Sequence, residues 1–217
     1  MNVLELFAGS RSIGKAAESL GMNVFSSDIN AFEGIHYAVD IRDFDISKVP
    51  FKPDVIWASP PCTYFSVASI GKHWNVDNTP KSDNALLGVE FVQKTIEIIK
   101  ALEPTYWFIE NPRGKLRKLD VMTTLQDQLS DSFFECWKVM RHTVTYCQYG
   151  DSRMKPTDIW TNCPNWIPRP MCKNGDTCHV SAPRGSQTGT QGLKGNYERS
   201  KIPNELCLEI LQSTMIL

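Results

Sequence analysis

The chain has 217 residues, of which 41% are hydrophobic and 22% are charged, values ordinary for one soluble globular domain. Its formal net charge is −1, and no apolar run approaches the length of a membrane-spanning helix. The N-terminus opens on an apolar segment rather than a basic leader, and we therefore expect a cytoplasmic protein. Residues 1–50 hold four basic and seven acidic side chains, whereas residues 151–217 hold eight basic and six acidic ones, so we expect any polyanion to contact the C-terminal third.

The first forty residues contain groups suited to a nucleoside. An apolar run at residues 2–7, a turn around Gly9 and helical spacing at residues 11–20 indicate a strand, a glycine turn and a helix. Such a turn lets a ligand approach the backbone. Asp28 and Asp40 each follow a short strand pattern, where an acid can accept hydrogen bonds from ribose hydroxyls, although each also fits an ordinary turn or cap. Together the three residues outline an adenosine-shaped site.

Cys62 follows a buried strand pattern at residues 54–58. Pro60 and Pro61 end that strand, because proline cannot donate a hydrogen bond to a sheet ladder. The thiol is therefore expected at the carboxyl end of a strand, where open α/β sheets bind ligands, and a half-buried cysteine in a turn is the alternative. Residues 67–84 leave directly from this loop and are rich in Ser, Gly, Asn and Asp, so we expect them to form a lid.

A second strand end carries Glu110. Residues 85–102 have helical spacing, and residues 105–109 form a strong strand pattern that runs into Glu110, so this carboxyl is expected at the same sheet edge as the thiol. The basic run at residues 113–118 fits a solvated turn. Further strand patterns, expected to form an antiparallel edge on a mostly parallel sheet, lie at residues 133–140, 143–149 and 157–160.

Seven cysteines without an export signal indicate a reactive thiol and a metal cluster rather than a disulfide framework. Residues 161–196 show no periodicity but contain a complete tetrahedral zinc set of three thiols and one imidazole. These candidate ligands, for which three unlinked thiols are the alternative, are Cys163, Cys172, Cys178 and His179. Residues 182–194 are polar and glycine-rich, which suits either contacts to phosphates and base edges or an ordinary surface loop. Residues 203–217 predict an apolar helix that closes onto the sheet.

Three motifs occur in order along the chain: LELFAGS at residues 4–10, SPPCTYFS at residues 59–66 and EN at residues 110–111. In this order and spacing they closely resemble the cytosine-C5 DNA methyltransferase family. The resemblance covers residues 1–160 and the C-terminal end of the chain. It implies an α/β, Rossmann-like fold that binds S-adenosylmethionine.

The resemblance also implies a division of the chain into three parts. These are a catalytic domain at residues 1–160, a reduced target-recognition region at residues 161–196, which contains the candidate zinc ligands described above, and a C-terminal helix at residues 197–217 that completes the catalytic domain.

Single residues acquire expected roles from the same resemblance. Cys62 would add to carbon 6 of cytosine as a thiolate and so make carbon 5 nucleophilic, while Glu110 would donate a hydrogen bond or proton to ring nitrogen 3. The base must leave the stack for this chemistry, and a cation from either Arg153 or Lys155 would assist. The residues implied to bind S-adenosylmethionine are Phe7, Ala8, Gly9, Asp28, Ile29, Asp40, Ile41, Pro60, Leu86 and Ser200.

The sequence departs from the family pattern at several positions. Thr63 stands where glutamine is usual after the nucleophile, and Pro112 stands where valine is usual after the acid. The target-recognition region is far shorter than usual, as in the compact members found in phages and prophages. This implies a short or relaxed target site and, for a phage-encoded member, the host cytoplasm.

We therefore expect a monomeric enzyme that methylates carbon 5 of cytosine in double-stranded DNA and does not bind membranes. Two alternatives are methylation of tRNA, the substrate of a relative in this family, and a non-catalytic, zinc-stabilised nucleic-acid-binding protein. The second is disfavoured because a binding module needs neither Cys62 nor Glu110. A nucleotide-dependent oxidoreductase is disfavoured because the three-glycine fingerprint is missing.

Overall fold

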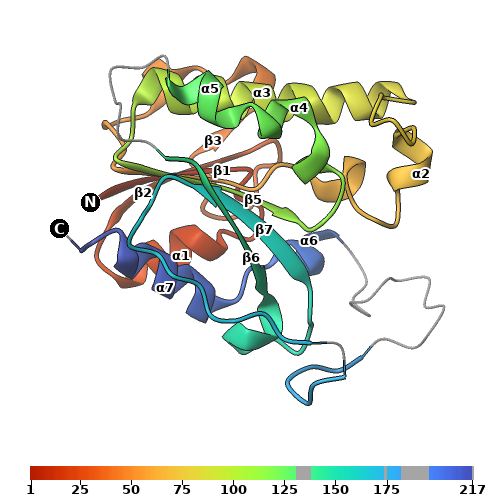
Figure 1. The fold of residues 1–217 in the computed structure, drawn as a ribbon. Helices are drawn as coiled ribbons and strands as arrows, with labels where there is room; N and C mark the ends of the chain where they lie inside the picture. Colours follow the sequence, from red (N-terminus) through yellow and green to blue (C-terminus); the bar gives the residue numbers. More distant parts are fainter. Residues whose placement is uncertain (131–137, 174, 182–195, 217) are drawn as a thin grey trace.

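A seven-stranded sheet forms the centre of the computed structural model, which describes residues 1–130, 138–173, 175–181 and 196–216 (Figure 1). The strands follow the order β3-β2-β1-β4-β5-β7-β6 across the sheet. Neighbours from β3 to β5 pair in parallel, and β7 pairs antiparallel with both β5 and β6. The strand bounds are β1 (Asn2–Leu6), β2 (Asn23–Asp28), β3 (Tyr37–Ala38), β4 (Val55–Ala58), β5 (Tyr106–Pro112), β6 (Met140–Thr145) and β7 (Pro156–Thr161).

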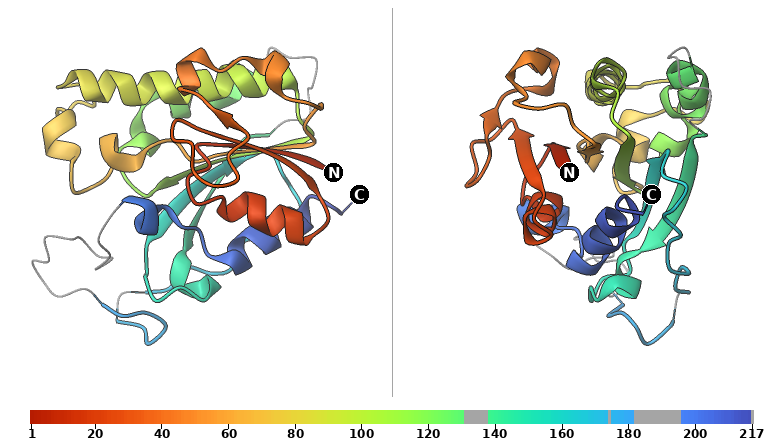
Figure 2. Two further views of the ribbon diagram at one scale, coloured as in Figure 1. Left: turned by 180° about the vertical axis from the view of Figure 1, so that it is seen from behind. Right: turned by 90° about the vertical axis from the view of Figure 1, so that its left-hand side faces the viewer.

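Helices cover both faces of this sheet (Figure 2). The long helix α3 lies over one face together with α4 and α5, and α1 and α7 pack together over the other face. The short helices α2 and α6 lie near the edge where the parallel strands end. The helix bounds are α1 (Ser12–Ser19), α2 (Ile70–His73), α3 (Asp83–Leu102), α4 (Asp120–Thr123), α5 (Leu125–Ser130), α6 (Asn196–Ser200) and α7 (Asn204–Ser213).

Two hydrophobic cores explain why the parallel strands are apolar at nearly every position. Side chains alternate between the faces of a strand, so Leu4 joins the core beneath α3, with Ile96, while Val3 joins the core beneath α1 and α7, with Ile210. All four side chains are almost completely buried. Each buried aliphatic side chain contributes about 1.5–3 kcal/mol of transfer free energy to folding.

The structure confirms the predicted α/β fold with a mostly parallel sheet and an antiparallel edge. The strand predicted at residues 143–149 is wrong in its bounds, because β6 ends at Thr145 and the chain then forms the 3-10 turn η5 (Tyr146–Tyr149). Gly150 closes this turn with a φ of 81°, a conformation that suits glycine. The strand predicted at residues 133–140 falls mainly on residues outside the described ranges, as does the polar segment at residues 182–194.

The expected lid contains more regular structure than its composition indicates. Helix α2 lies within residues 67–84, and α3 begins at Asp83 with the hydroxyl of Ser82 accepting a hydrogen bond from the backbone N–H of Ala85. Ser82 is a favourable N-cap, which the composition of the segment hides. Among the described residues, no helix combines the length and apolar character needed to cross a bilayer.

Candidate active site

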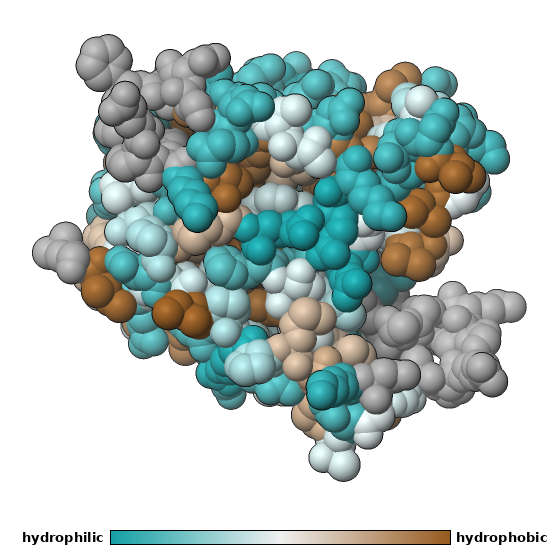
Figure 3. All heavy atoms as spheres, viewed as in Figure 1, coloured by the Kyte–Doolittle hydropathy of each residue, from teal (hydrophilic) through white to brown (hydrophobic). Residues whose placement is uncertain are grey.

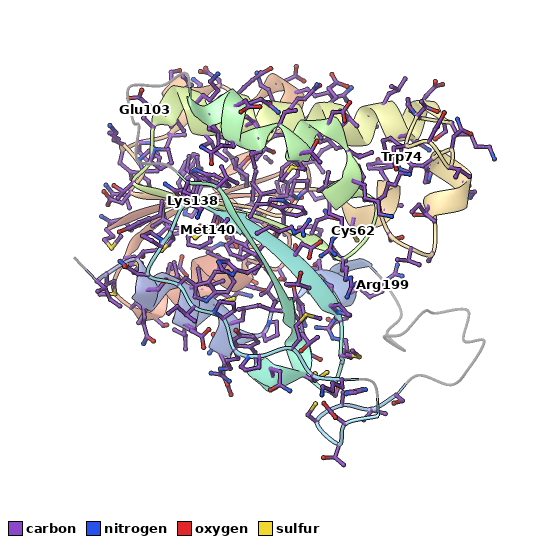
Figure 4. The ribbon with its side chains drawn as sticks, viewed as in Figure 1. Cys62, Trp74, Glu103, Lys138, Met140 and Arg199 are labelled. Carbon is purple, nitrogen blue, oxygen red and sulfur yellow. The ribbon has the colours of Figure 1, made fainter. Side chains whose placement is uncertain are left out.

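Cys62 begins the 3-10 turn η3 (Cys62–Tyr64), just after β4 and its two prolines. The side-chain amide of Asn111 donates a 2.8 Å hydrogen bond to the carbonyl of Pro60, which ties this loop to the end of β5. The cysteine is exposed and lies at the same edge of the sheet as Arg199 (Figure 4). The residue therefore reaches solvent, while its backbone is fixed from the neighbouring strand.

The segment that follows the cysteine is anchored by aromatic packing. Phe65 is fully buried and stacks on Trp74, whose indole N–H donates a 2.7 Å hydrogen bond to the carbonyl of Tyr64. The carbonyl of Phe65 accepts a 2.8 Å hydrogen bond from the backbone N–H of Lys115. Gly114 allows this approach, because a side-chain carbon there would lie 2.3 Å from the same carbonyl oxygen. The base of the expected lid is thus held in place.

Glu110 lies inside β5, one strand away from Cys62, and only 5% of the residue is exposed. Its Oε1 atom accepts a 3.1 Å hydrogen bond from the hydroxyl of Tyr146 and lies 4.0 Å from Nζ of Lys155. The lysine ammonium also donates a 3.2 Å hydrogen bond to the carbonyl of Arg199 and lies 4.6 Å from the centre of the Tyr146 ring. A buried carboxylate needs such partners, because burial without them is costly.

Two cations and one carboxylate set the electrostatic environment of Cys62. Desolvation raises the pKa of the thiol, because surrounding atoms crowd the sulfur although the residue reaches solvent. The positive charge of Lys155 lowers this pKa, the negative charge of Glu110 raises it and the positive charge of Arg199 lowers it. Neutralising the Glu110 carboxyl would therefore favour the thiolate, which is the nucleophilic form.

The two candidate cations occupy different environments. Arg153 forms two hydrogen bonds from Nε to Asp151, at 2.8 and 2.9 Å, and donates a 3.2 Å bond to the carbonyl of Lys201. Its pKa is raised, first of all by the hydrogen bonds to the Asp151 carboxylate. Lys155 is the cation beside Glu110. The structure therefore favours Lys155 over Arg153 as the cation near the acid, a choice that the sequence left open.

The turn after β1 brings together several residues expected to bind the cofactor. Phe7 and Gly9 have φ angles of 54° and 49°, so the backbone is left-handed on both sides of Ala8. The carboxylate of Asp28 accepts a 2.9 Å hydrogen bond from the Gly9 N–H. A side-chain carbon at Gly9 would lie 3.6 Å from Oγ of Ser200, so the C-terminal segment adjoins the same turn.

The remaining expected cofactor residues divide into exposed and buried groups. Ile29 and Leu86 have 64% and 55% of their surface exposed, unusual values for large aliphatic side chains. Ile41 and Pro60 are buried, and Ile41 belongs to the core beneath α3. Asp40 caps a 3-10 turn, and hydrogen bonds from the Arg42 side chain lower its pKa. Exposed apolar groups beside the two acidic side chains of Asp28 and Asp40 fit a nucleoside with its ring and its hydroxyls.

The metal-binding prediction needs one correction. Four ligand atoms lie within 4.8 Å of one another, and they belong to Cys147, Cys172, Cys178 and His179. The predicted ligand Cys163 is elsewhere: it is fully buried, and its sulfur lies 3.7 Å from Oγ of Ser213. The prediction relied on distance along the chain, where Cys163 is closer than Cys147 to the other ligands. In the fold, β6 places Cys147 rather than Cys163 beside them.

A groove of about 510 Å³ lies between α2 and the basic run that follows β5. Val67 and Val76 form part of its lining and are 72% and 103% exposed, and Figure 3 shows apolar patches over α2 beside a hydrophilic band. The basic side chains of the lining are Arg113, Lys115, Arg117 and Lys118. The basic run therefore faces a cavity rather than only bulk solvent.

Sequence reasoning missed two residues of these sites. Tyr146 contacts Glu110, and Cys147 joins the cluster of candidate metal ligands. The two residues are adjacent in a turn that carries no motif. The one signal in the sequence was a further cysteine, Cys147, within the strand pattern predicted at residues 143–149.

A family model and a viral relative of this chain both point to the same family of proteins. The family model described as C-5 cytosine-specific DNA methylase matches residues 1–150. A protein of Frog virus 3 (isolate Goorha), named "Probable DNA (cytosine-5)-methyltransferase", is 28% identical over 234 residues, which cover 97% of this chain and 99% of the viral protein.

Solved structures agree on the fold. The methyltransferase EhMeth of Entamoeba histolytica has a TM-score of 0.55 and 16% identity, and the match covers 74% of this chain and 52% of that one. The Dnmt2 methyltransferase of S. pombe has a TM-score of 0.51 and 14% identity, and the match covers 74% of this chain and 48% of that one. The chain thus spans nearly the full length of its viral relative but about half the length of these solved structures.

Proposed function

The chain belongs to the C-5 cytosine-specific DNA methylase family, and on that premise we propose that it transfers a methyl group from S-adenosylmethionine to carbon 5 of cytosine in DNA. The main support for this proposal is the position of three side chains. Cys62 follows β4 and Glu110 lies in the adjacent parallel strand β5, with Lys155 4.0 Å from the Glu110 carboxylate. A sulfur nucleophile, an acid and a cation thus converge at one sheet edge.

Cys62 performs the first covalent step. Its thiolate forms a bond to carbon 6 of the cytosine ring, and the electron pair of the bond between carbons 5 and 6 moves to carbon 5. Lys155 and Arg199 support this step, because their positive charges favour the thiolate. With the methyl donor bound, carbon 5 would bond to the sulfonium methyl group and the demethylated thioether would leave. Solvent water would then take the proton from carbon 5, the electron pair of that C–H bond would re-form the double bond between carbons 5 and 6, and the bond between carbon 6 and sulfur would break to return the Cys62 thiolate.

Glu110 acts on the opposite side of the ring. In its protonated form the carboxyl can donate a hydrogen bond or proton to ring nitrogen 3, where negative charge accumulates as the sulfur adds. Tyr146 holds the carboxyl through its 3.1 Å hydrogen bond, and burial raises the pKa of Tyr146 so that its hydroxyl remains a donor. Once Glu110 is neutral, one influence that raises the pKa of Cys62 is removed.

The first turns of the chain hold the methyl donor. S-adenosylmethionine supplies an electrophilic methyl group on a sulfonium centre. Asp28 accepts hydrogen bonds from the ribose hydroxyls and Asp40 from the adenine, while the backbone at Gly9 lets the ligand approach closely. The exposed side chains of Ile29 and Leu86 supply apolar contacts. The full set proposed for this role is Phe7, Ala8, Gly9, Asp28, Ile29, Asp40, Ile41, Pro60, Leu86 and Ser200.

The substrate is double-stranded DNA, from which the target cytosine is rotated out of the stack. A base inside the duplex cannot offer both of its ring faces to protein groups. The segment after Cys62 is anchored through Phe65 and Trp74, so it forms a rigid entrance to the site. We propose that the chain acts as a monomer.

Labelled methyl transfer tests this function directly. The full chain is incubated with labelled S-adenosylmethionine and with DNA or tRNA in parallel. We expect label in DNA at carbon 5 of cytosine, and bisulfite sequencing of the product reports the target site. Label in tRNA alone would refute DNA as the substrate.

A further inference from the structure

The cysteine-rich segment meets the turn after β6 at a cluster of three thiols and one imidazole. The sulfurs of Cys147 and Cys172 lie 3.1 Å apart, and those of Cys147 and Cys178 lie 3.6 Å apart. Nδ1 of His179 lies 3.8 Å from the Cys172 sulfur and 3.6 Å from the Cys178 sulfur. These four atoms come from two segments that β6 and β7 bring together.

We propose that Cys147, Cys172, Cys178 and His179 bind one structural Zn²⁺ ion. Zinc in tetrahedral sites binds sulfur at about 2.3 Å and histidine nitrogen at about 2.0–2.1 Å. Tetrahedral geometry then separates two sulfurs by about 3.8 Å and a sulfur from a nitrogen by about 3.5 Å. Three of the four separations given above, at 3.6–3.8 Å, match these values, whereas the sulfurs of Cys147 and Cys172 lie closer together at 3.1 Å. All four ligand atoms lie within 4.8 Å of one another.

A disulfide explains the cluster less well. The 3.1 Å between the sulfurs of Cys147 and Cys172 exceeds the S–S bond of about 2.05 Å, and all three cysteines of the cluster are free. A disulfide would also leave a third thiol and the His179 ring without a role. Three soft ligands and one imidazole match zinc rather than a cation that prefers oxygen.

The surroundings of the cluster are organised as in metal sites, where outer hydrogen bonds fix the ligands. The side-chain amide of Gln148 donates a 3.5 Å hydrogen bond to the Cys178 sulfur. The backbone N–H of Cys172 donates a 3.0 Å hydrogen bond to Oγ1 of Thr145. Cys147 and Cys172 are buried, whereas Cys178 and His179 lie nearer the surface.

The ion cross-links a segment that has little other structure. The described residues of the ranges 167–173 and 175–181 contain neither helix nor strand, and their exposed side chains include Ile167, Met171 and Val180. A metal can supply the folding free energy that such a segment lacks. The proposal is independent of methyl transfer, because it concerns how this segment is held to η5.

Metal analysis of the purified full chain tests the site, with Cys163 as a matched control. We expect about one Zn²⁺ per chain in the wild type, as in other four-ligand zinc sites. Cys147→Ser and Cys172→Ser should lose the metal. Cys163→Ser should keep it, because Cys163 lies outside the cluster and a serine there can still meet Ser213.

Two variants of His179 test the same site if a cysteine variant fails to fold. His179→Cys should retain zinc in a four-thiolate site, whereas His179→Ala should release it to a chromogenic chelator much faster than the wild type. Cobalt substituted for zinc should give the visible absorption of tetrahedral thiolate coordination. The proposal is overturned if the wild type neither contains nor takes up Zn²⁺, or if zinc depends on Cys163 and not on Cys147. A disulfide between Cys147 and Cys172 in the intact protein would overturn it as well.

Discussion

Nζ of Lys155 lies 4.0 Å from Oε1 of Glu110, and both side chains are almost completely buried. β5 and β7 are antiparallel neighbours, so Lys155, which immediately precedes β7, reaches the same end of the sheet as Glu110. The carbonyl of Arg199 accepts a hydrogen bond from the same ammonium. The pair therefore links the C-terminal segment to the edge at which Cys62 stands.

Lys155→Met should make Cys62 a weaker nucleophile. Lys155 is the cation with the largest effect in lowering the pKa of this thiol, so the variant should contain less thiolate at neutral pH. We expect several-fold slower alkylation of Cys62 by iodoacetamide and a loss of methyl transfer of about 10- to 100-fold. Mass spectrometry of the Cys62 peptide measures the first effect.

Arg153→Met is the matched control for Lys155→Met. Arg153 is bound to Asp151 and is not among the charges that act on Cys62, so its removal should leave the alkylation rate of Cys62 unchanged. Equal slowing of alkylation in the two variants would show that Lys155 has no special effect on the thiol.

Glu110→Gln should reduce methyl transfer by about 10²- to 10⁴-fold, because an amide of the same shape cannot donate a proton to the ring. Tyr146→Phe removes one hydrogen bond to Glu110 and should cost about tenfold. DNA binding should be retained in both variants, which a filter-binding assay measures. If Glu110→Gln methylates DNA at the wild-type rate, the carboxyl is not the acid.

The stability of the chain should depend on pH through Glu5. Burial raises the pKa of Glu5 from 4.5 to about 7, although its carboxylate accepts hydrogen bonds from Ser26 and from the N–H of Ile13. The folded state therefore binds this proton more tightly than the unfolded state. Protonated Glu5 therefore adds to the free energy of unfolding. This contribution is fully present below pH 4.5 and is lost as the pH rises through about 7, and the free energy of unfolding falls by about 3 kcal/mol in total.

Glu5→Gln isolates this effect, because glutamine preserves the shape of the side chain but does not ionise. Urea unfolding at pH 5 and at pH 7.5 should show the variant gaining stability relative to the wild type at the higher pH. An identical difference between the two proteins at both pH values would contradict the assignment to Glu5.

The basic side of the groove should bind DNA phosphates. Arg113→Ala and Lys118→Ala each remove an exposed cation from its lining, and each phosphate contact that is lost should reduce the slope of log K against log salt by about 0.9. Lys100→Ala removes an exposed cation from α3, outside the groove, and should leave the slope unchanged. Equal slopes for all three variants would exclude the groove as a DNA contact.

Much of the architecture could be predicted because local patterns determine it. The strands that precede Cys62 and Glu110 are apolar at nearly every position, as buried parallel strands must be, and the two prolines mark a strand end. The helix pattern at residues 85–102 corresponds to α3, which differs only at its first turn. These features depend on neighbouring residues, which the sequence displays directly.

The contacts between distant segments could not be predicted in the same way. Cys147 was missed and Cys163 was wrongly chosen as a ligand, because the distance between thiols depends on how β6 turns into η5. The choice between Arg153 and Lys155 also required the strand register, since residues two apart on one segment have different partners. Spacing in the sequence contains neither kind of information.

A covalent complex with DNA that contains 5-fluorocytosine tests the central claim most directly. Fluorine at carbon 5 cannot leave as the proton does, so the bond between Cys62 and carbon 6 should persist after methyl transfer. In the presence of S-adenosylmethionine, we predict a protein–DNA complex that survives denaturation for the wild type and is absent for Cys62→Ser, which keeps its DNA binding. Efficient methylation of ordinary cytosine DNA without such a complex, or a complex that forms equally with Cys62→Ser, would contradict the account.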